Sequence, residues 1–337
     1  MSPLMEELGL PLLGVLVGFI VLVWAADRFI EGAAGLARNL GVSPLVVGLT
    51  IVGFGTSAPE MLVSGLAAWE GNSGIAIGNA LGSNITNLAL VLGITALFIP
   101  MHVGSAILRR EFPVMLLVMV AALLLLVDDR LGRLDGILLL GGMVAYVVWL
   151  AWLARNDGGT ADPMVSTLTE EVPEGLPTGR ALLWTLTGLL LLLGSARLIV
   201  WGASTAAASM GVSDLVIGLT IVAIGTSLPE LAAALSSARK REFEMALGNV
   251  IGSNIFNLLG VLGLPGVIHA TAVPAGVLQR DFPAMLLLTA LVFLFALGRG
   301  GSDGHINRRE GGVLVAVYLG WLAWLLLSPG SLPGRLT

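Results

Sequence analysis

The sequence predicts an all-α polytopic membrane protein. Hydrophobic residues make up 56% of the 337-residue chain and charged residues only 12%, about half the charged share of a typical soluble domain. The mean hydropathy is +0.94. A helix needs roughly 20 apolar residues to cross a bilayer, so a chain of this length can hold about ten crossing helices with their loops. The absence of cysteine excludes disulfides and thiolate metal sites.

Ten apolar segments lie between charged residues and Gly, Pro or Asn breaks in the chain. In the first half they cover residues 9–29, 44–69, 73–99, 104–127 and 134–154. In the second half they cover residues 181–208, 213–238, 243–269, 275–298 and 309–328. Each segment has the length that a membrane-spanning helix requires, so we expect ten transmembrane helices.

One distinctly polar stretch, residues 155–180, separates these two groups of helices. It contains three prolines and five acidic residues, and it is too short to fold as a domain. We therefore expect a cytoplasmic connector between a first unit, residues 1–154, and a second unit, residues 181–337.

The two units repeat each other at an offset of 170 residues. The sequence GLTIVGFGTSAPE at 48–60 returns as GLTIVAIGTSLPE at 218–230, with 10 of 13 positions identical. The sequence GNALGSNITNL at 78–88 returns as GNVIGSNIFNL at 248–258, with 8 of 11 positions identical. Because each unit has an odd number of helices, the second must enter the membrane from the opposite side. We therefore expect two inverted five-helix repeats. In many secondary transporters this arrangement places a site near the bilayer midplane.

The positions of Lys and Arg predict the orientation. With the N-terminus outside, 11 of these residues fall in cytoplasmic loops and 4 on the outer side. Since cytoplasmic loops carry the excess of positive charge, we expect both termini outside. The expected location is the cytoplasmic (inner) membrane of a prokaryote, with the bilayer as the main partner and no nucleic acid.

The first repeated motif places a carboxylate, two hydroxyls and a proline inside an apolar segment. A carboxylate at this depth costs about 3 kcal/mol or more and by default marks an ion or proton site. Thr56, Ser57 and Glu60 share one helix face because they are three and four residues apart. Pro59 and Pro229 each leave a carbonyl four residues earlier without its helical donor. Such an all-oxygen ligand set suits hard cations, including Ca²⁺ and Na⁺.

The second repeated motif combines close helix packing with polar side chains. Gly78 and Gly82 have the spacing that allows two helices to approach closely, and the same spacing recurs at 248 and 252. A hydroxyl and an amide four residues apart share a face in both repeats, at Ser83 and Asn87 and again at Ser253 and Asn257. The other repeated amides favour hydrogen bonding between helices over direct ion binding; they are Asn79, Asn84, Asn249 and Asn254. The three histidines, His102, His269 and His305, share no metal-binding spacing, and we expect them at the membrane interface.

Together the paired GTSxPE and GSNIxN signatures resemble the sodium/calcium exchanger family of the cation/calcium exchanger superfamily. The resemblance spans nearly the whole chain. It implies four cation sites in a diamond between helices two, three, seven and eight, and a sliding pair formed by helices one and six. It also implies a monomer that transports Ca²⁺ and Na⁺ as substrates and needs no cofactor.

The resemblance also assigns roles to residues by their position in the motifs. Glu60 and Glu230 resemble the central ligands shared by Ca²⁺ and Na⁺. The residues that resemble flanking ligands, through carbonyls, hydroxyls or amides, are Gly53, Thr56, Ser57, Ser83, Asn87, Ala223, Thr226, Ser227 and Ser253. Asn257 departs from the pattern, because microbial exchangers and the potassium-dependent branch have Asp there. The site then carries two negative charges, which one Ca²⁺ or two Na⁺ balance; a third Na⁺ would make exchange electrogenic.

The leading hypothesis is a secondary antiporter that moves Ca²⁺ against Na⁺ by alternating access. The nearest alternative is H⁺-coupled exchange of Ca²⁺ or another divalent cation. Proton-coupled relatives tend to place an acidic residue where this chain has Gly82 and Gly252, which counts against that alternative. A remote alternative is an intramembrane enzyme with the two glutamates as an acid/base pair. No phosphate-binding loop or Gly-x-Ser-x-Gly nucleophile motif is present in the sequence, so the sequence gives no support for ATP-driven or hydrolytic chemistry.

Overall fold

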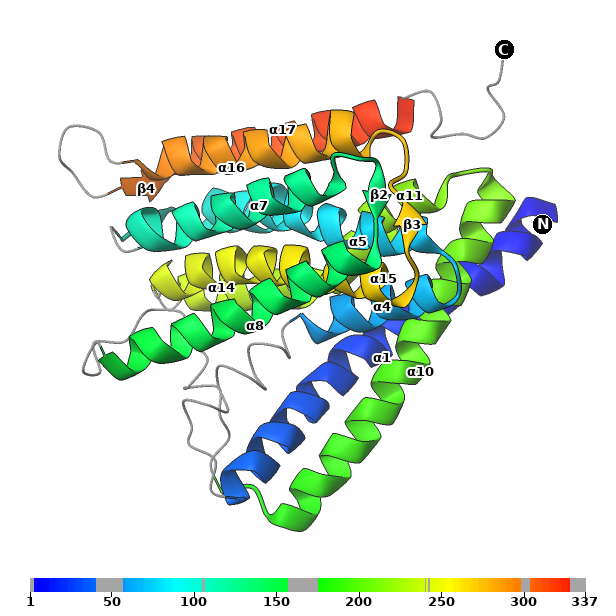
Figure 1. Cartoon of the computed structure of the whole chain (residues 1–337), viewed down its shortest axis with the longest axis horizontal. Helices are drawn as coiled ribbons and strands as arrows, with labels where there is room; N and C mark the ends of the chain where they lie inside the picture. The colour runs from blue at the N-terminus through cyan, green and yellow to red at the C-terminus, as the bar shows by residue number, and fades with distance from the viewer. Residues whose placement is uncertain are drawn as a thin grey trace.

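The computed structural model describes residues 3–40, 57–104, 107–156, 175–239, 241, 243–297 and 304–327 as a bundle of helices (Figure 1). In the first unit the helices are α1 (Pro3–Asn39), α4 (Ala58–Trp69), α5 (Ser73–Ile85), α6 (Leu92–Phe98), α7 (Phe112–Leu126) and α8 (Arg133–Asn156). In the second unit they are α10 (Thr178–Met210), α11 (Asp214–Ile217), α12 (Ala223–Thr226), α13 (Leu228–Arg239), α14 (Phe243–Phe256), α15 (Gly263–Ile268), α16 (Phe282–Ala296) and α17 (Arg308–Leu327).

Seven helical stretches in the described part of the chain are long and apolar enough to cross a membrane. They cover residues 8–39, 73–98, 133–153, 178–210, 243–268, 277–296 and 308–327. An eighth stretch runs from α11 to α13 and bends by 41° at its break. All eight overlap predicted segments. The predicted segment 104–127 contains α7, and of segment 44–69 only α4 lies within the described residues.

The predicted end of the first helix near residue 29 is wrong, because α1 continues to Asn39. Charged residues suggested that end, but the structure pairs them within the helix. The Arg28 guanidinium donates to the Glu31 carboxylate at 2.7 Å and lies 4.8 Å from the ring centroid of Trp184 on α10. Packing against α10 therefore stabilises the helical conformation of α1 beyond Arg28 and Glu31.

α1 and α10 pack against each other along their length and run obliquely to the other helices (Figure 1). Glycines allow this close approach. A Cβ at Gly188 would lie 2.7 Å from the backbone nitrogen of Phe29, and one at Gly18 would lie 2.6 Å from the Ile199 side chain. The pair is thus held together by backbone contact that larger residues would prevent.

Local structure recurs at equivalent positions in the two units. Four π-helical turns interrupt the helices: η2 (Thr86–Val91), η3 (Ile107–Glu111), η5 (Asn257–Val261) and η6 (Val277–Asp281). The first and third, and the second and fourth, lie about one 170-residue offset apart. A fifth, η4 (Gly218–Val222), joins α11 to α12.

Two short antiparallel sheets connect the units. β1 (Met101–Val103) pairs with β4 (Gly304–Ile306), and β2 (Arg130–Leu131) pairs with β3 (Thr271–Ala272). The two sheets lie at opposite ends of the bundle (Figure 1). The start of α1 and the end of α17 both lie toward the end that carries β2 and β3.

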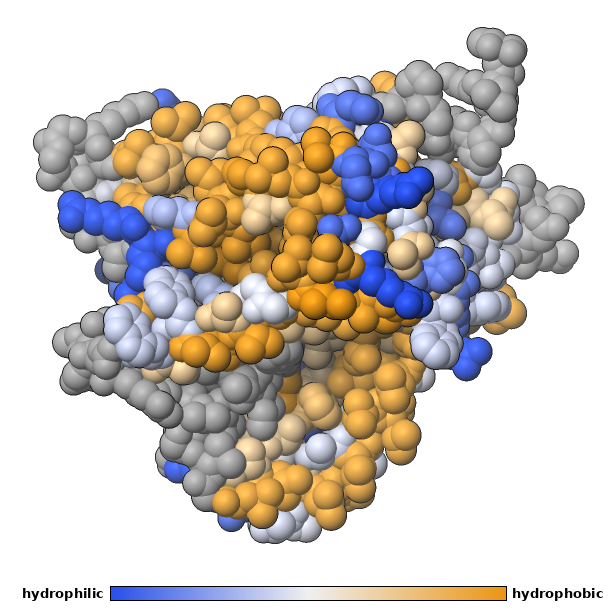
Figure 2. Space-filling view, in the orientation of Figure 1, coloured by the Kyte–Doolittle hydropathy of each residue, from blue (hydrophilic) through white to orange (hydrophobic). Residues whose placement is uncertain are grey.

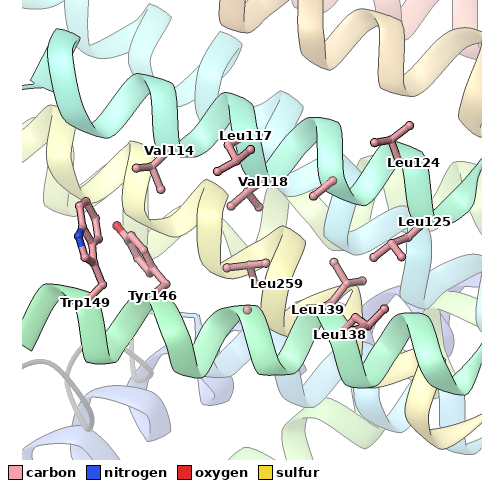
Figure 3. A pocket seen from close by; sticks show the side chains of 12 residues that line it. Val114, Leu117, Val118, Leu124, Leu125, Leu138, Leu139, Tyr146, Trp149 and Leu259 are labelled. Carbon is pink, nitrogen blue, oxygen red and sulfur yellow. The ribbon is translucent and has the colours of Figure 1, made fainter.

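The outer surface of the bundle is apolar, as Figure 2 shows over α7, α16 and α17. Exposed residues on these and neighbouring helices include Leu117, Leu124 and Leu319. A groove of about 640 Å³ between α7 and α8 is lined almost entirely by apolar side chains, with Leu259 of η5 at its floor (Figure 3). Such a surface is stable in hydrocarbon and unfavourable in water.

Candidate functional site

Both GTSxPE motifs lie where a helix begins at the centre of the bundle. α12 ends at Thr226 and α13 begins at Leu228, with Ser227 between them at φ −85° and ψ 5°. Ser57 has nearly the same backbone, φ −97° and ψ 6°, immediately before α4. Pro59 and Pro229 lie in the first turn of α4 and α13, where the missing N–H costs little. Pro229 still leaves the Gly225 carbonyl without its helical donor.

The two central carboxylates are buried together. Glu60 is 0% exposed and Glu230 is 2% exposed, and the negative charge of Glu230 acts on Glu60. The Thr226 hydroxyl lies near Glu60 and the Ser253 hydroxyl near Glu230, without full hydrogen-bond geometry. Among the described residues, none of the four carboxylate oxygens has a hydrogen-bond partner, and neither glutamate forms an ion pair.

Further oxygen atoms from both units are buried and have no hydrogen-bond partner in the described part of the chain. They are the hydroxyls of Ser57, Ser227 and Ser253, the amide oxygens of Asn84, Asn87 and Asn257, and the hydroxyl of Thr86. The amide nitrogen of Asn257 also has no partner. More than nine in ten buried polar groups are normally paired. A concentration of unpaired oxygens in the predicted motifs is therefore what a cation-binding centre requires.

Asn79 joins the first motif to the second unit. Its amide nitrogen donates to the Glu60 carbonyl at 3.2 Å and to the Ser64 hydroxyl at 2.9 Å. Its amide oxygen accepts from the Thr226 hydroxyl at 3.2 Å. The Ser83 hydroxyl lies 3.5 Å from the same hydroxyl. Asn79 thereby fixes the backbone of one carboxylate relative to a polar neighbour from the other half.

Other amides hydrogen-bond between helices, as predicted. Asn84 donates to the Asn254 carbonyl at 3.2 Å, and Asn87 donates to the Asn254 side-chain oxygen at 3.3 Å. The prediction is confirmed for Asn79, Asn84 and Asn254. The amide nitrogen of Asn249 has no partner among the described residues, and for this residue the interhelical role stays a prediction. These bonds align α5 with α14.

The predicted glycine contacts are present on α5. A Cβ at Gly78 would lie 2.7 Å from the Leu215 carbonyl oxygen, and one at Gly82 would lie 2.7 Å from the Leu219 Cα and the Ala223 Cβ. Because most of these atoms are backbone, even alanine could not fit without a helix shift. Glycine at both positions therefore lets α5 approach η4 and α12 closely.

The structure brings together most of the predicted ligands. Gly53 and Thr56 lie outside the described residues. The Ala223 carbonyl accepts from the Ser227 backbone N–H at 3.1 Å, and the Thr226 hydroxyl lies 3.4 Å from it. The other predicted ligands are buried, and they are Glu60, Glu230, Ser57, Ser227, Ser83, Ser253, Asn87, Asn257 and Thr226.

Phe19, which no sequence pattern singles out, lies against the second GTSxPE motif. The ring of Phe19 on α1 packs directly against the Cα of Gly225, in the space that a Cβ would occupy. Phe19 is 9% exposed, whereas Leu189, one repeat offset later on α10, is 38% exposed. The repeat gave no signal because the two residues differ, and only the packing of α1 reveals the contact.

A contact between two histidines also lies outside the sequence motifs. His102 and His305 are direct partners across β1 and β4, with ring centroids 5.2 Å apart. No sequence pattern predicts this contact, because strand pairing joins positions that are distant in sequence; the interfacial position of the histidines stays a prediction. Within the described residues, no group of three or more His, Asp or Glu side chains has metal-binding proximity.

Known proteins share this sequence and fold. Residues 10–152 and 180–327 match the family described as sodium/calcium exchanger protein. The chain is 48% identical over 314 residues to the putative antiporter CaxA of Alkalimonas amylolytica, covering 93% of this chain and 98% of the relative. It is 41% identical over 319 residues to the inner membrane protein YrbG of Escherichia coli, covering 94% and 97%.

A further relative and a solved structure agree with these matches. The chain is 33% identical over 348 residues to the sodium/calcium exchanger MaX1 of Methanosarcina acetivorans, covering 92% and 97%. A structure of the sodium-calcium exchanger NCX_Mj soaked with 10 mM Na⁺ and 10 mM Sr²⁺ superposes with a TM-score of 0.61 at 33% identity, covering 94% of this chain and 98% of that one.

Proposed function

The chain belongs to the sodium/calcium exchanger family, a family of membrane cation antiporters rather than enzymes, and from this premise we propose that it exchanges Na⁺ for Ca²⁺ by alternating access as a monomer. The observation that carries the proposal is the buried pair of carboxylates contributed by the two units, surrounded by oxygen atoms without hydrogen-bond partners. Oxygen ligands select hard cations over soft ones.

The charge of this centre supports competition between the two substrates. Glu60 and Glu230 contribute two negative charges, and Asn257 contributes none. One Ca²⁺ or two Na⁺ neutralise the pair, so the two ions compete for the same carboxylates. A charged group in hydrocarbon is costly. The ion centre can therefore move past apolar side chains readily only when bound ions have neutralised its carboxylates.

We assign the ion-binding role to the residues of the four motif copies. The central ligands are the two glutamates. The flanking ligands are Gly53, Thr56, Ser57, Ser83, Asn87, Ala223, Thr226, Ser227, Ser253 and Asn257. Support comes from the burial of the described members and from the bonds of Asn79 to both units.

The proposed architecture is ten transmembrane helices in two inverted repeats, residues 1–154 and 181–337, with both termini outside. Support for the inversion comes from the sheets: β1 and β3 are one repeat offset apart, yet they lie at opposite ends of the bundle (Figure 1). A repeat related by an axis along the membrane normal would place them at the same end. The excess of Lys and Arg predicts that the end with β1 and β4 faces the cytoplasm.

In the proposed cycle, α1 and α10 move as one body past the ion centre. Their mutual backbone contacts and their oblique packing support such a movement. Phe19 would then cover the centre from one side while it rests on Gly225, and displacement of α1 would uncover it.

Transport in membrane vesicles tests the proposal. An outward Na⁺ gradient should drive ⁴⁵Ca uptake in vesicles that contain the wild-type protein. Glu60→Gln should abolish the uptake, whereas Glu244→Gln, which removes an exposed carboxylate at the start of α14, should not. Absence of Na⁺-driven uptake in the wild type, or full uptake by Glu60→Gln, would refute the proposed function.

H⁺-coupled exchange remains the second candidate. The observation in its favour is that both buried carboxylates lack partners, so each can bind a proton as well as Na⁺. A pH gradient imposed in Na⁺-free medium separates the two mechanisms. Uptake driven by that gradient, with none driven by Na⁺, would replace Na⁺ by H⁺ in the proposal.

A further inference from the structure

The pairing of β1 with β4 creates a surface feature outside the ion centre. His102 and His305 are direct cross-strand partners, and both are exposed. Their neighbours along the strands, Met101, Val103 and Ile306, are buried. Because side chains alternate between the faces of a strand, both imidazoles project from the same outward face of the sheet.

The geometry of this pair suits a shared ligand. The ring centroids are 5.2 Å apart and the ring planes are inclined by 41°. Nitrogens that bind one metal ion at about 2.0–2.1 Å lie at most roughly 4 Å apart. Two exposed imidazoles whose centroids are 5.2 Å apart can present ring nitrogens at this separation.

Neighbouring residues orient one of the rings. Phe243, at the start of α14, packs against His102 with centroids 5.8 Å apart. The carboxylate of Glu244 lies against Gly104, two residues beyond His102. An apolar ring therefore restricts the imidazole while an acidic group lies at the same end of the bundle.

We propose that His102 and His305 bind a divalent transition-metal ion such as Ni²⁺, Cu²⁺ or Zn²⁺. Neutral imidazole nitrogen is a preferred ligand for these ions and a poor one for Ca²⁺. The two histidines supply two positions, and water completes the coordination shell. The bound ion links the strand that follows α6 to the strand that precedes α17, so it fastens the first unit to the second at this end. The site is separate from the carboxylate centre and does not depend on which ion drives transport.

Calorimetric titration of purified, full-length protein without a polyhistidine tag tests this site. Saturating Ca²⁺ keeps added Ni²⁺ away from the carboxylate centre. The wild type should bind one Ni²⁺, and His102→Gln or His305→Gln should each weaken binding by about tenfold or more, as removal of a metal's supporting groups does. The double variant should bind more weakly than either single variant, because each single variant keeps one imidazole ligand.

His269→Gln is the matched control, since it removes the third histidine of the chain. It should bind Ni²⁺ like the wild type. Electron paramagnetic resonance with Cu²⁺ gives a second readout, with nitrogen hyperfine structure from two imidazoles in the wild type and one in each single variant. Unchanged Ca²⁺ transport in the histidine variants would confirm their folding. Wild-type binding by either single variant, equal loss in His269→Gln, or no binding by the wild type would overturn the proposal.

Discussion

Glu60→Gln should stabilise the protein in the absence of ions and remove its stabilisation by Ca²⁺. Glu60 is fully buried, neither of its carboxylate oxygens has a hydrogen-bond partner among the described residues, and Glu230 lies close enough to interact with it electrostatically. Glutamine has a similar shape and no charge. The substitution therefore removes an unfavourable interaction from the ion-free state and a ligand from the ion-bound state.

The expected size of each effect follows from this environment. An unpartnered buried polar group costs about 1–3 kcal/mol, and a charged one costs more. The glutamine amide introduces donors of its own, so we expect a net gain near the lower limit, about 1 kcal/mol. By contrast, a ligand at 100 times its Kd stabilises the state that binds it by about 2.7 kcal/mol. The variant should lose most of this stabilisation by Ca²⁺, because its site retains only one negative charge.

Thermal unfolding of the detergent-solubilised protein measures both effects. The Tm of Glu60→Gln should exceed that of the wild type in Na⁺-free buffer with a chelator. The wild type should show the higher Tm once Ca²⁺ saturates its site. Glu230→Gln should behave in the same way, and the exposed Glu244→Gln should follow the wild type in both buffers. A variant that melts below the wild type without ions, or that keeps the full Ca²⁺ shift, would contradict this account of the carboxylate pair.

Three further substitutions probe the same region. Asn257→Asp adds a third buried carboxylate, so it should lower the ion-free Tm and enlarge the shift produced by Ca²⁺; an unchanged shift would place Asn257 away from the ions. Thr226→Val removes the donor to the Asn79 oxygen and should lower the free energy of unfolding by about 1–3 kcal/mol. The measured effects should be a lower Tm and slower Na⁺-driven ⁴⁵Ca uptake. Wild-type values for both would mean that this bond is not important. Gly82→Ala would place a Cβ 2.7 Å from Leu219 and should destabilise by about 1–3 kcal/mol, while Gly141→Ala, which meets no atom within 4 Å, should not; equal Tm values for the two variants would refute the close contact.

Much of the helical framework could be predicted from the sequence because apolar length alone defines a membrane-spanning helix. Eight of the predicted segments overlap a span or a bent pair of helices. The end of α1 could not be predicted in this way. Arg28 and Glu31 suggested a boundary, but their ion pair and the contact of Arg28 with Trp184 keep the charges within the helix.

Within the candidate site, the repeated motifs identified the residues, and the structure supplied their relations. The interhelical role of Asn84 and Asn254 followed from their repetition in a packing motif. The bond from Thr226 to Asn79 did not, because it joins positions 147 residues apart with no shared pattern. Phe19 gave no signal at all, since its partner Gly225 is distant and its repeat equivalent is a leucine.

The sequence by itself determined that the chain lies in a membrane, that it contains a duplicated unit, and that each unit contributes one buried carboxylate. Composition and repetition suffice for these conclusions, because hydrocarbon excludes unpaired charges unless they serve a function. Only the tertiary structure decided that the two carboxylates lie within reach of each other's charge, that Phe19 covers their neighbourhood, and that His102 meets His305. These contacts depend on how closely helices and strands from the two units approach, and that distance is set by packing across the whole bundle.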